Sequence, residues 1–360
     1  MNNLDHLGWD DYFDKQFDAY RSSGLVPAKI VSRTGHVYMT DNGTERMQAQ
    51  VSGHFQYTAV EAGDYPAIGD WVLMRGDTGS CIIERVLDRK SRFSRHAAGR
   101  ETEEQIIASN IDLMFIAAAL EGGRNFTERG IERYIVMVRD GGADPVIVLN
   151  KCDLCDEEQR NDFLQRIRPV AGDIPVMMVS ALRGEGLDAL RAMLSRGRCA
   201  AFTGPSGVGK SALINALLND TVQRTGAIRE DDKRGRHTTT HQELFCLEGG
   251  AMLIDTPGLR ELRPYAELES LDSTFLEIAQ AAAECRFKDC SHTDEPGCNV
   301  LRLLADGIID QERYQSYLNL RREIEIVEMR NSEKGRAQQK ARDKQLSKIV
   351  REYKKKFADR

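Results

Sequence analysis

Short runs of β-forming residues, separated by polar turns, fill the chain between residues 27 and 95. Turn sequences such as Asp41-Asn-Gly lie between the runs, and this alternation is typical of antiparallel strands. Five runs in such a short segment predict a small barrel, and the OB-fold is the obvious candidate. Such barrels often bind nucleic acid, although a purely structural role fits the same pattern. The five runs are 28–33, 36–40, 47–52, 70–74 and 81–86.

The pattern changes after residue 105, where buried apolar runs begin to alternate with segments of helical period. The polar stretch 93–105 that precedes them is interpreted as a linker. Alternating strands and helices predict an α/β domain with a largely parallel sheet and helices on both faces. The expected strands are 111–119, 145–150, 174–180, 242–247 and 251–255, and the expected helices are 127–139, 157–168 and 186–196.

Two further segments have the apolar spacing of helices. Aromatic residues in 1–24 recur every three or four positions, which predicts a short amphipathic helix that packs on the rest of the chain. A second apolar stripe runs from Tyr314 to Val327 and is followed by a polar tail. The expected organisation is an N-terminal helical extension, an OB-fold domain, an α/β domain, a helical domain and a C-terminal tail. Their limits are 1–26, 27–95, 96–262, 263–330 and 331–360.

Composition narrows the class of protein. The 360 residues, 41% of them apolar, are sufficient for two or three domains. Because no apolar run approaches about 18 residues and the first residues are acidic and aromatic, neither a membrane span nor a signal peptide is expected. We therefore expect a cytoplasmic protein whose eight cysteines are thiols or metal ligands.

Charge is distributed unevenly along the chain. The net charge is -6, but residues 331–360 carry 11 Lys and Arg against 4 Asp and Glu, which gives this tail a charge of +7. A basic tail on an acidic body suggests a polyanionic partner. A solvated helical extension without a partner is the alternative.

A phosphate-binding loop is the clearest chemical motif. Gly204-Pro-Ser-Gly-Val-Gly-Lys-Ser211 lies between an apolar run and a leucine-spaced helix, which is the context that this motif requires. Its backbone N–H groups and helix start favour phosphate oxygens, Lys210 would neutralise the β and γ phosphates, and Ser211 would bind Mg²⁺. The expected nucleotide contacts in this loop are Gly204, Pro205, Ser206, Gly207, Val208, Gly209, Lys210, Ser211 and Ala212.

The base is indicated by Asn150-Lys-Cys-Asp153, which follows an apolar run and fits the guanine pattern Asn-Lys-x-Asp. A carboxylate at Asp153 can accept hydrogen bonds from the N1–H and exocyclic amine of guanine, a donor pair that adenine lacks. Lys151 belongs to the same motif. After the next predicted strand, Ser180-Ala181 matches the backbone contact that GTPases make to the guanine ring. Cys152-x-x-Cys155 also fits a redox motif, but its place in this loop favours a structural role.

Elements that respond to the γ phosphate lie after the phosphate loop. Asp255-Thr-Pro-Gly258 follows an apolar run, so Asp255 would hold Mg²⁺ through water and the Gly258 N–H would face the γ phosphate. Gly235-Arg-His-Thr-Thr-Thr240 precedes it. One of its threonines can complete the Mg²⁺ shell, and Thr239 is the choice among three equivalent neighbours. Leu259 stands where many GTPases have a glutamine that orients water.

Four potential metal ligands lie within 14 residues: Cys285, Cys290, His292 and Cys298. This Cys₃His set suits tetrahedral structural zinc and leaves no open position for catalysis. Pro296 and Gly297 supply the turn that would fold the ligands back. The site predicts one structural Zn²⁺.

The GTPase motifs occur in an unusual order, since the guanine motifs precede the phosphate loop. A sheet whose ends lie close together can be joined there and opened elsewhere, so the order indicates a circular permutation. This order of motifs, the segment Asp255-Thr-Pro-Gly-Leu-Arg-Glu-Leu262 and the cysteine cluster occur together here. In these features the chain resembles the small-ribosomal-subunit-dependent GTPases of the bacterial RsgA family. The resemblance covers about residues 27–330.

The resemblance implies an OB domain, a permuted GTPase domain and a zinc domain that act in late maturation of the small ribosomal subunit. The residues themselves argue for GTP or GDP, Mg²⁺ and zinc, whereas the small subunit and its RNA as partners follow from the resemblance. We also expect a monomer with no membrane contact. The resemblance also suggests that His237 replaces the missing glutamine, while contact with RNA or solvent is the alternative. Two other functions share some of these motifs: an ATP-dependent kinase, and an RNA-binding module with a structural nucleotide.

Overall fold

The computed structural model describes residues 4–60, 62–76, 81–96, 104–121, 126–225, 242–255 and 268–326. It divides into two compact units, residues 1–263 and 264–360. The predicted switch residues His237 and Thr239, the Gly258 turn and the basic tail lie outside the described residues.

Unit 1 begins with short helices rather than the single amphipathic helix predicted for 1–24. They are η1 (Asp5–Leu7), α1 (Asp11–Phe17) and η2 (Asp18–Tyr20). The break has a local cause, because Gly8 takes a φ of 82° and the Asp10 side chain caps α1 by accepting from the Tyr12 N–H. The aromatic spacing nevertheless predicted packing correctly, since Trp9 lies edge-to-face on the buried Trp71, with ring centroids 4.8 Å apart.

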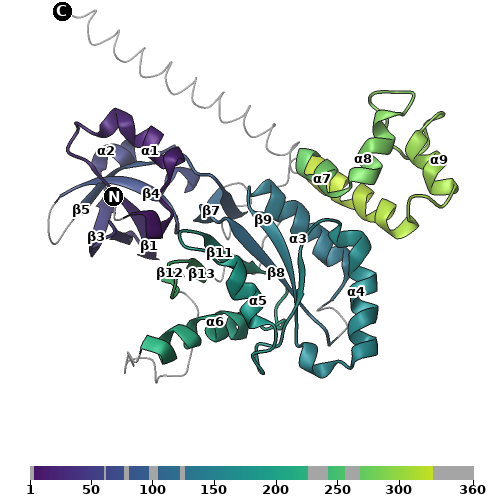
Figure 1. Ribbon diagram of the computed structural model, residues 1–360. Coiled ribbons are helices and arrows are strands. Elements are labelled where there is room, and N and C mark those ends of the chain that lie inside the picture. The colour runs from purple at the N-terminus through teal and green to yellow at the C-terminus, as the bar shows by residue number, and fades with distance from the viewer. Residues whose placement is uncertain are drawn as a thin grey trace, which may run out of the picture. The chain divides into compact units, whose positions relative to one another are not determined.

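The five predicted strands form a barrel (Figure 1). The strands pair in the order first, second, third, fifth and fourth, and the ring closes because the first strand also bonds to the fourth. Alternate residues such as Ile30, Tyr38 and Ile83 point inward and are buried. The strands are β1 (Val26–Thr34), β2 (Val37–Asp41), β3 (Arg46–Val51), β4 (Trp71–Arg75) and β5 (Cys81–Val86), with helix α2 (Gly53–Thr58) and the turn η3 (Ala62–Asp64) between β3 and β4.

The stretch 93–105 was predicted as a linker, and this was wrong at both of its ends. Strands β6 (Arg92–His96) and β7 (Glu104–Ser109) pair as an antiparallel ribbon. Phe93 is buried and packs on Gly141, where a Cβ would clash with its ring. The sequence does not reveal the ribbon because β6 is polar apart from Phe93 and the apolar residues of β7, Ile106 to Ala108, are consecutive, so neither strand has an alternating period.

The α/β part has the predicted parallel sheet, with spatial order β10-β9-β8-β11-β13 and the antiparallel strand β12 beside β13. Figure 1 shows this sheet with its helices on both sides. The strands are β8 (Leu113–Ala119), β9 (Asp144–Asn150), β10 (Val176–Met178), β11 (Cys199–Thr203), β12 (Gln242–Cys246) and β13 (Met252–Asp255). The helices are α3 (Glu128–Asp140), α4 (Glu157–Ala171), α5 (Leu187–Met193) and α6 (Lys210–Thr225).

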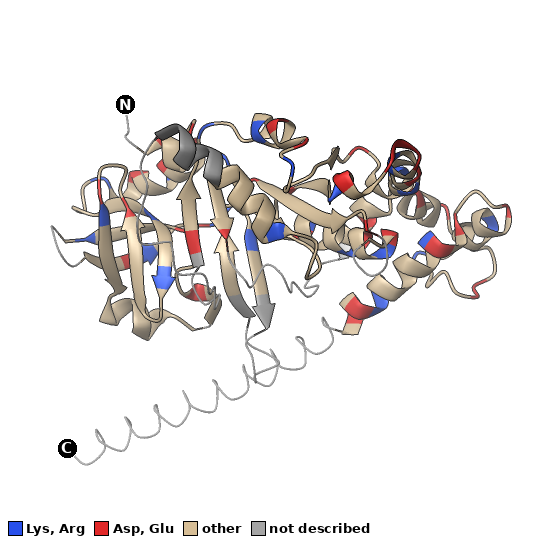
Figure 2. Ribbon diagram, turned by 90° about the horizontal axis from the view of Figure 1, so that it is seen from below, with Lys and Arg blue, Asp and Glu red and all other residues tan. Residues whose placement is uncertain are grey.

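Alternation along β8 explains the two layers of helices. Met114 and Ile116 face a cluster that contains Ile135 of α3 and other residues of α3 and α4. Their neighbours in the strand face the other cluster, where Leu213 of α6 packs together with α5. Because both faces are covered, β8 is buried at every position and carries no charge. Figure 2 shows that uncharged residues predominate in the strands.

The barrel continues the sheet of the α/β part, which the sequence did not predict. Ser32 of β1 pairs in antiparallel register with Glu243 of β12, so one sheet of 11 strands runs through both parts. A buried ion pair lies where the barrel meets β7: Asp70 accepts from Arg89 at 2.7 Å and from the Ser109 hydroxyl. Such a fully bonded carboxylate fixes geometry more than it adds stability.

Unit 2 is helical. Leu271, Phe275, Tyr317 and Ile324 are among its buried residues, and the rings of Phe275 and Tyr317 meet at 5.6 Å. The helices are α7 (Leu268–Thr274), α8 (Leu276–Ala283), α9 (Asn299–Ala305) and a last helix over residues 311–326. None of the helices that the structure describes, in either unit, has the length and apolar character needed to span a bilayer.

Candidate functional site

The predicted nucleotide motifs meet at one edge of the parallel sheet. Asn150 ends β9, Ser180 follows β10, the phosphate loop follows β11, and Asp255 ends β13. These four strands run parallel within the sheet, so their carboxyl ends lie at the same edge, where open α/β sheets bind ligands. The order of motifs along the chain therefore does not affect their assembly in space.

The phosphate loop requires glycine at specific places. Gly204 has a φ of 130°, and a Cβ there would lie 2.2 Å from the carbonyl oxygen of Ala117. A Cβ at Gly209, where φ is 96°, would lie 2.4 Å from the Asn150 amide nitrogen. Gly207 also has a positive φ, of 88°. The loop thus packs closely on β8 and β9 while its backbone takes conformations that side chains disfavour.

Lys210 crosses this loop from the start of α6. Its ammonium is buried and donates to the carbonyl oxygens of Gly204 at 2.6 Å and Pro205 at 2.5 Å. These are neutral acceptors, which phosphate oxygens could replace with charged ones. Of the other predicted loop contacts, Val208 is buried, Pro205 and Gly209 are half-buried, and Ser206, Gly207, Ser211 and Ala212 are exposed.

Asn150 connects three motifs through one buried amide. Its nitrogen donates to the carbonyl oxygen of Val208 at 2.9 Å, in the phosphate loop. Its oxygen accepts from the Ala181 N–H at 3.1 Å, in the second guanine motif. The side chain thus holds the loops that follow β9, β10 and β11 together.

The carboxylate of Asp153 is presented by the turn η5 (Cys152–Leu154), which follows the left-handed residue Lys151. The side chain is only 7% exposed. A hydrogen bond from the Ser180 hydroxyl lowers the pKa of Asp153, and the more distant charge of Arg183, whose Nε is 4.0 Å away, acts in the same direction. Asp153 is therefore ionised at neutral pH and can accept two hydrogen bonds from guanine.

Three residues near the guanine motifs were not identified from the sequence. Glu121 accepts from Lys151 at 2.7 Å, which holds this side chain beside the base loop. Arg160 of α4 reaches the turn η5 and also Glu185, in the loop after β10. None of the three belongs to a recognised motif, and each contacts residues distant in sequence, so the chain alone gave no signal for them.

Only part of the predicted magnesium site can be placed. Ser211 lies in the first turn of α6, and Asp255 ends β13 beside Glu243 of β12. Thr239, His237 and Gly258, which complete the predicted switch, lie outside the described residues.

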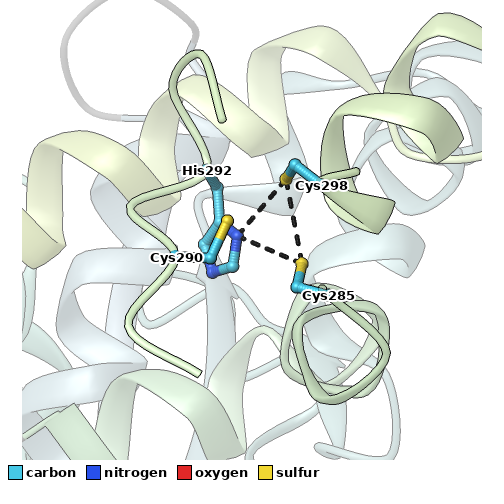
Figure 3. A group of neighbouring side chains, drawn as sticks. All are labelled: Cys285, Cys290, His292 and Cys298. Atoms are coloured by element: carbon cyan, nitrogen blue, oxygen red, sulfur yellow. Dashed lines mark hydrogen bonds between the residues drawn. The ribbon is translucent and has the colours of Figure 1, made fainter. Parts of the chain in front are cut away.

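In unit 2 the four predicted metal ligands come together (Figure 3). Their ligand atoms all lie within 4.8 Å of one another. The His292 Nδ1 is 3.7 Å from the Cys285 sulfur and 3.6 Å from the Cys298 sulfur, and these two sulfurs are 3.8 Å apart. Cys290, His292 and Cys298 are buried, which is unusual for so many polar groups unless they share a ligand. Three thiols and one imidazole fit tetrahedral zinc.

Groups around this cluster support it. The N–H of Asn299 points to the Cys285 sulfur at 3.3 Å, and burial, which would raise the pKa of Cys285, is outweighed by hydrogen bonds from the Val300 and Asn299 backbone, so its pKa falls. The hydroxyl of Tyr314 donates to the His292 carbonyl at 2.6 Å, where His292 has a φ of 64°. These contacts orient the ligands and favour a thiolate.

Comparison with known proteins agrees with this geometry. The family model described as "RsgA GTPase" matches residues 86–264, and a second one, described as "50S ribosome-binding GTPase", matches residues 199–357. The "Small ribosomal subunit biogenesis GTPase RsgA" of Methanosarcina acetivorans is 42% identical, covering 98% of this chain and 94% of the relative. The protein of the same name from Opitutus terrae is 40% identical over 89% of each chain.

Solved structures give the same result. YjeQ from Thermotoga maritima is 26% identical and has a TM-score of 0.64, covering 83% of this chain and 98% of that one. YloQ, described as "a circularly permuted GTPase", has a TM-score of 0.63 and covers 85% of this chain and 97% of that one. At 21% identity, YloQ supports the fold alone. The permuted sheet predicted from the order of the motifs is thus confirmed, and the chain belongs to the RsgA family of GTPases.

Proposed function

We propose that this chain binds the small ribosomal subunit, hydrolyses GTP to GDP and phosphate with stimulation by that subunit, and acts in its late maturation. The observation that carries the proposal is the meeting of Asn150, Asp153 and the phosphate loop at one sheet edge. The names of the relatives supply the ribosomal partner. A monomer that works in the cytoplasm, where subunits mature, fits this role.

The proposed nucleotide site uses the predicted residues in separate roles. Asp153 accepts from guanine, and the Ser180-Ala181 backbone lines the ring. Lys210 exchanges its present carbonyl acceptors for phosphate oxygens. Ser211 and Thr239 hold Mg²⁺, with Asp255 acting through water. The ion, when bound, offsets the charge that develops on the phosphate oxygens.

Hydrolysis needs an oriented water, and Leu259 cannot hydrogen-bond one. We assign this role to His237, in the segment 235–240 that precedes Asp255. Without a partner the rate should be slow, on the order of intrinsic Ras-like rates. Replacing His237 by Ala should lower the stimulated rate of phosphate release with unchanged GTP affinity, and an unchanged stimulated rate would exclude His237.

We further propose that loss of the γ phosphate weakens binding to the subunit. Asp255-Thr-Pro-Gly258 precedes the connection to unit 2, so a change there can reach the zinc-binding helices. Co-sedimentation with purified small subunits tests this. A GTP analogue should give tighter binding than GDP, whereas equal affinities would contradict the proposal, because a ligand shifts an equilibrium only through differential affinity.

One alternative also fits part of the molecule. An RNA-binding module with a structural nucleotide would retain the barrel and the cysteine cluster but release no phosphate. Measurement of phosphate release distinguishes the two. A kinase is disfavoured by the ionised Asp153, because adenine lacks the pair of donors that the carboxylate would accept from in guanine.

A further inference from the structure

The side chain of Arg160 makes a second connection between the loops after β9 and β10, which Asn150 also joins. It projects from the first turns of α4 towards η5, where its Nε donates to the carbonyl oxygens of Cys152 at 3.0 Å and Cys155 at 3.3 Å. These two carbonyls flank Asp153 and the rest of the turn. Arg160 thus bonds to the backbone on both sides of the residue that would bind the base.

The other half of the guanidinium reaches the loop after β10. Its two terminal nitrogens lie 2.7 and 3.5 Å from the two carboxylate oxygens of Glu185. The Glu185 carbonyl in turn accepts from the Ser180 N–H at 2.9 Å. The contacts thus link Arg160, η5 and Glu185 to the backbone of Ser180. The Ser180 hydroxyl in turn lowers the pKa of Asp153.

We propose that Arg160 is a positioning residue for guanine recognition, which acts by holding Asp153 and Ser180 in register through its pair with Glu185. This inference rests on the proposed nucleotide site. The planar guanidinium can bond to two carbonyls and a carboxylate at once, which a lysine cannot do. We call the set Arg160, Glu185 and the carbonyls of Cys152 and Cys155 the guanine clamp.

The exposure of the guanine clamp argues for positioning over stability. The side chains of Arg160 and Glu185 are 30% and 45% exposed, and pairs of this kind add little to the stability of a fold. Arg160 nevertheless lowers the pKa of Glu185, so the pair stays ionised at neutral pH. Small shifts of an acceptor have large effects on a bound base, since two hydrogen bonds must align together.

Comparison of GDP with inosine diphosphate tests the clamp. The inosine nucleotide lacks the exocyclic amine, so it makes one hydrogen bond to Asp153 where GDP makes two. The variant Arg160→Ala should raise the Kd for GDP about tenfold, the loss expected for charge-assisted hydrogen bonds, and the Kd for inosine diphosphate about threefold. The preference for GDP should therefore fall about threefold. Arg160→Lys and Glu185→Gln should also lower the preference for GDP. These two variants provide the same test if Arg160→Ala does not fold.

Arg166 provides a matched control on the same helix. It pairs with Glu128 and Asp162, away from the guanine motifs, so Arg166→Ala should leave both Kd values unchanged. If Arg160→Ala weakens both nucleotides equally, or neither, while the wild-type protein prefers GDP, the guanine clamp is refuted and the nucleotide site stands. If the wild-type protein shows no preference for GDP, the proposed site fails and the clamp fails with it.

Discussion

At the scale of single residues, the candidate site depends on a few polar groups that each serve several motifs. The buried amide of Asn150 bonds to the phosphate loop and to Ala181, which explains why separate motifs form one site. The sequence identified Asn150 and Asp153 because their spacing is that of a known pattern. It could not identify Arg160, because its partner Glu185 lies 25 positions further along and no spacing rule relates them.

Replacement of Asp153 by Asn should change the preferred base. The amide would donate where the carboxylate accepted, so GTP affinity should fall about 100-fold and xanthosine triphosphate should become the better ligand. Nucleotide binding by fluorescence measures both. Asp156→Asn is the control, because it removes the same charge at the N-cap of α4, a position where Asn is also favourable. It should leave the base preference unchanged. Retained GTP preference in the Asp153 variant would contradict the assignment.

Replacement of Gly204 by Ala should destabilise the fold, because the new Cβ meets the Ala117 carbonyl at 2.2 Å and φ is 130°. We expect a loss of about 3 kcal/mol in the free energy of unfolding, as for a clash combined with backbone strain. Gly184→Ala is the matched comparison: its φ is 75° but the space around it is open, so about 1 kcal/mol is expected. Denaturant titration measures the free energy of unfolding of both variants. Equal losses would contradict the predicted clash at Gly204.

At the scale of elements, apolar period predicted most strands and helices well. The five barrel strands and the α/β alternation are confirmed to within a few residues. Two features escaped for physical reasons. The β6–β7 ribbon is largely polar, and the pairing of β1 with β12 joins segments some 200 residues apart, which no local pattern encodes. The permuted order itself was readable, because each motif keeps its own strand.

The cysteine cluster should hold about one zinc ion per chain and should stabilise the helices of unit 2. Cys290→Ser is expected to abolish most bound zinc and to lower helix content, because metal-binding free energy is coupled to folding in such sites. Metal analysis and circular dichroism check this. Cys246→Ser, at an exposed cysteine of β12, should change neither. Full zinc content in the Cys290 variant would exclude it as a ligand.

At the scale of the whole molecule, excess positive charge is concentrated in the tail 331–360, which has 11 basic and 4 acidic residues. If the tail lies on RNA phosphates, removing it should weaken binding to small subunits and make that binding less sensitive to salt. Co-sedimentation of the full chain and of a chain ending at residue 330, between 50 and 200 mM salt, measures both effects. Identical salt dependence for the two chains would leave the tail without a role in binding RNA.

The proposed function is that of a permuted GTPase whose turnover is stimulated by the small ribosomal subunit. Its most direct test is single-turnover hydrolysis of GTP with and without purified small subunits. We predict slow phosphate release by the protein alone and stimulation of at least about 100-fold by the subunit, as for GTPases whose switch is ordered by a partner. Equal rates in the two conditions would contradict the central claim.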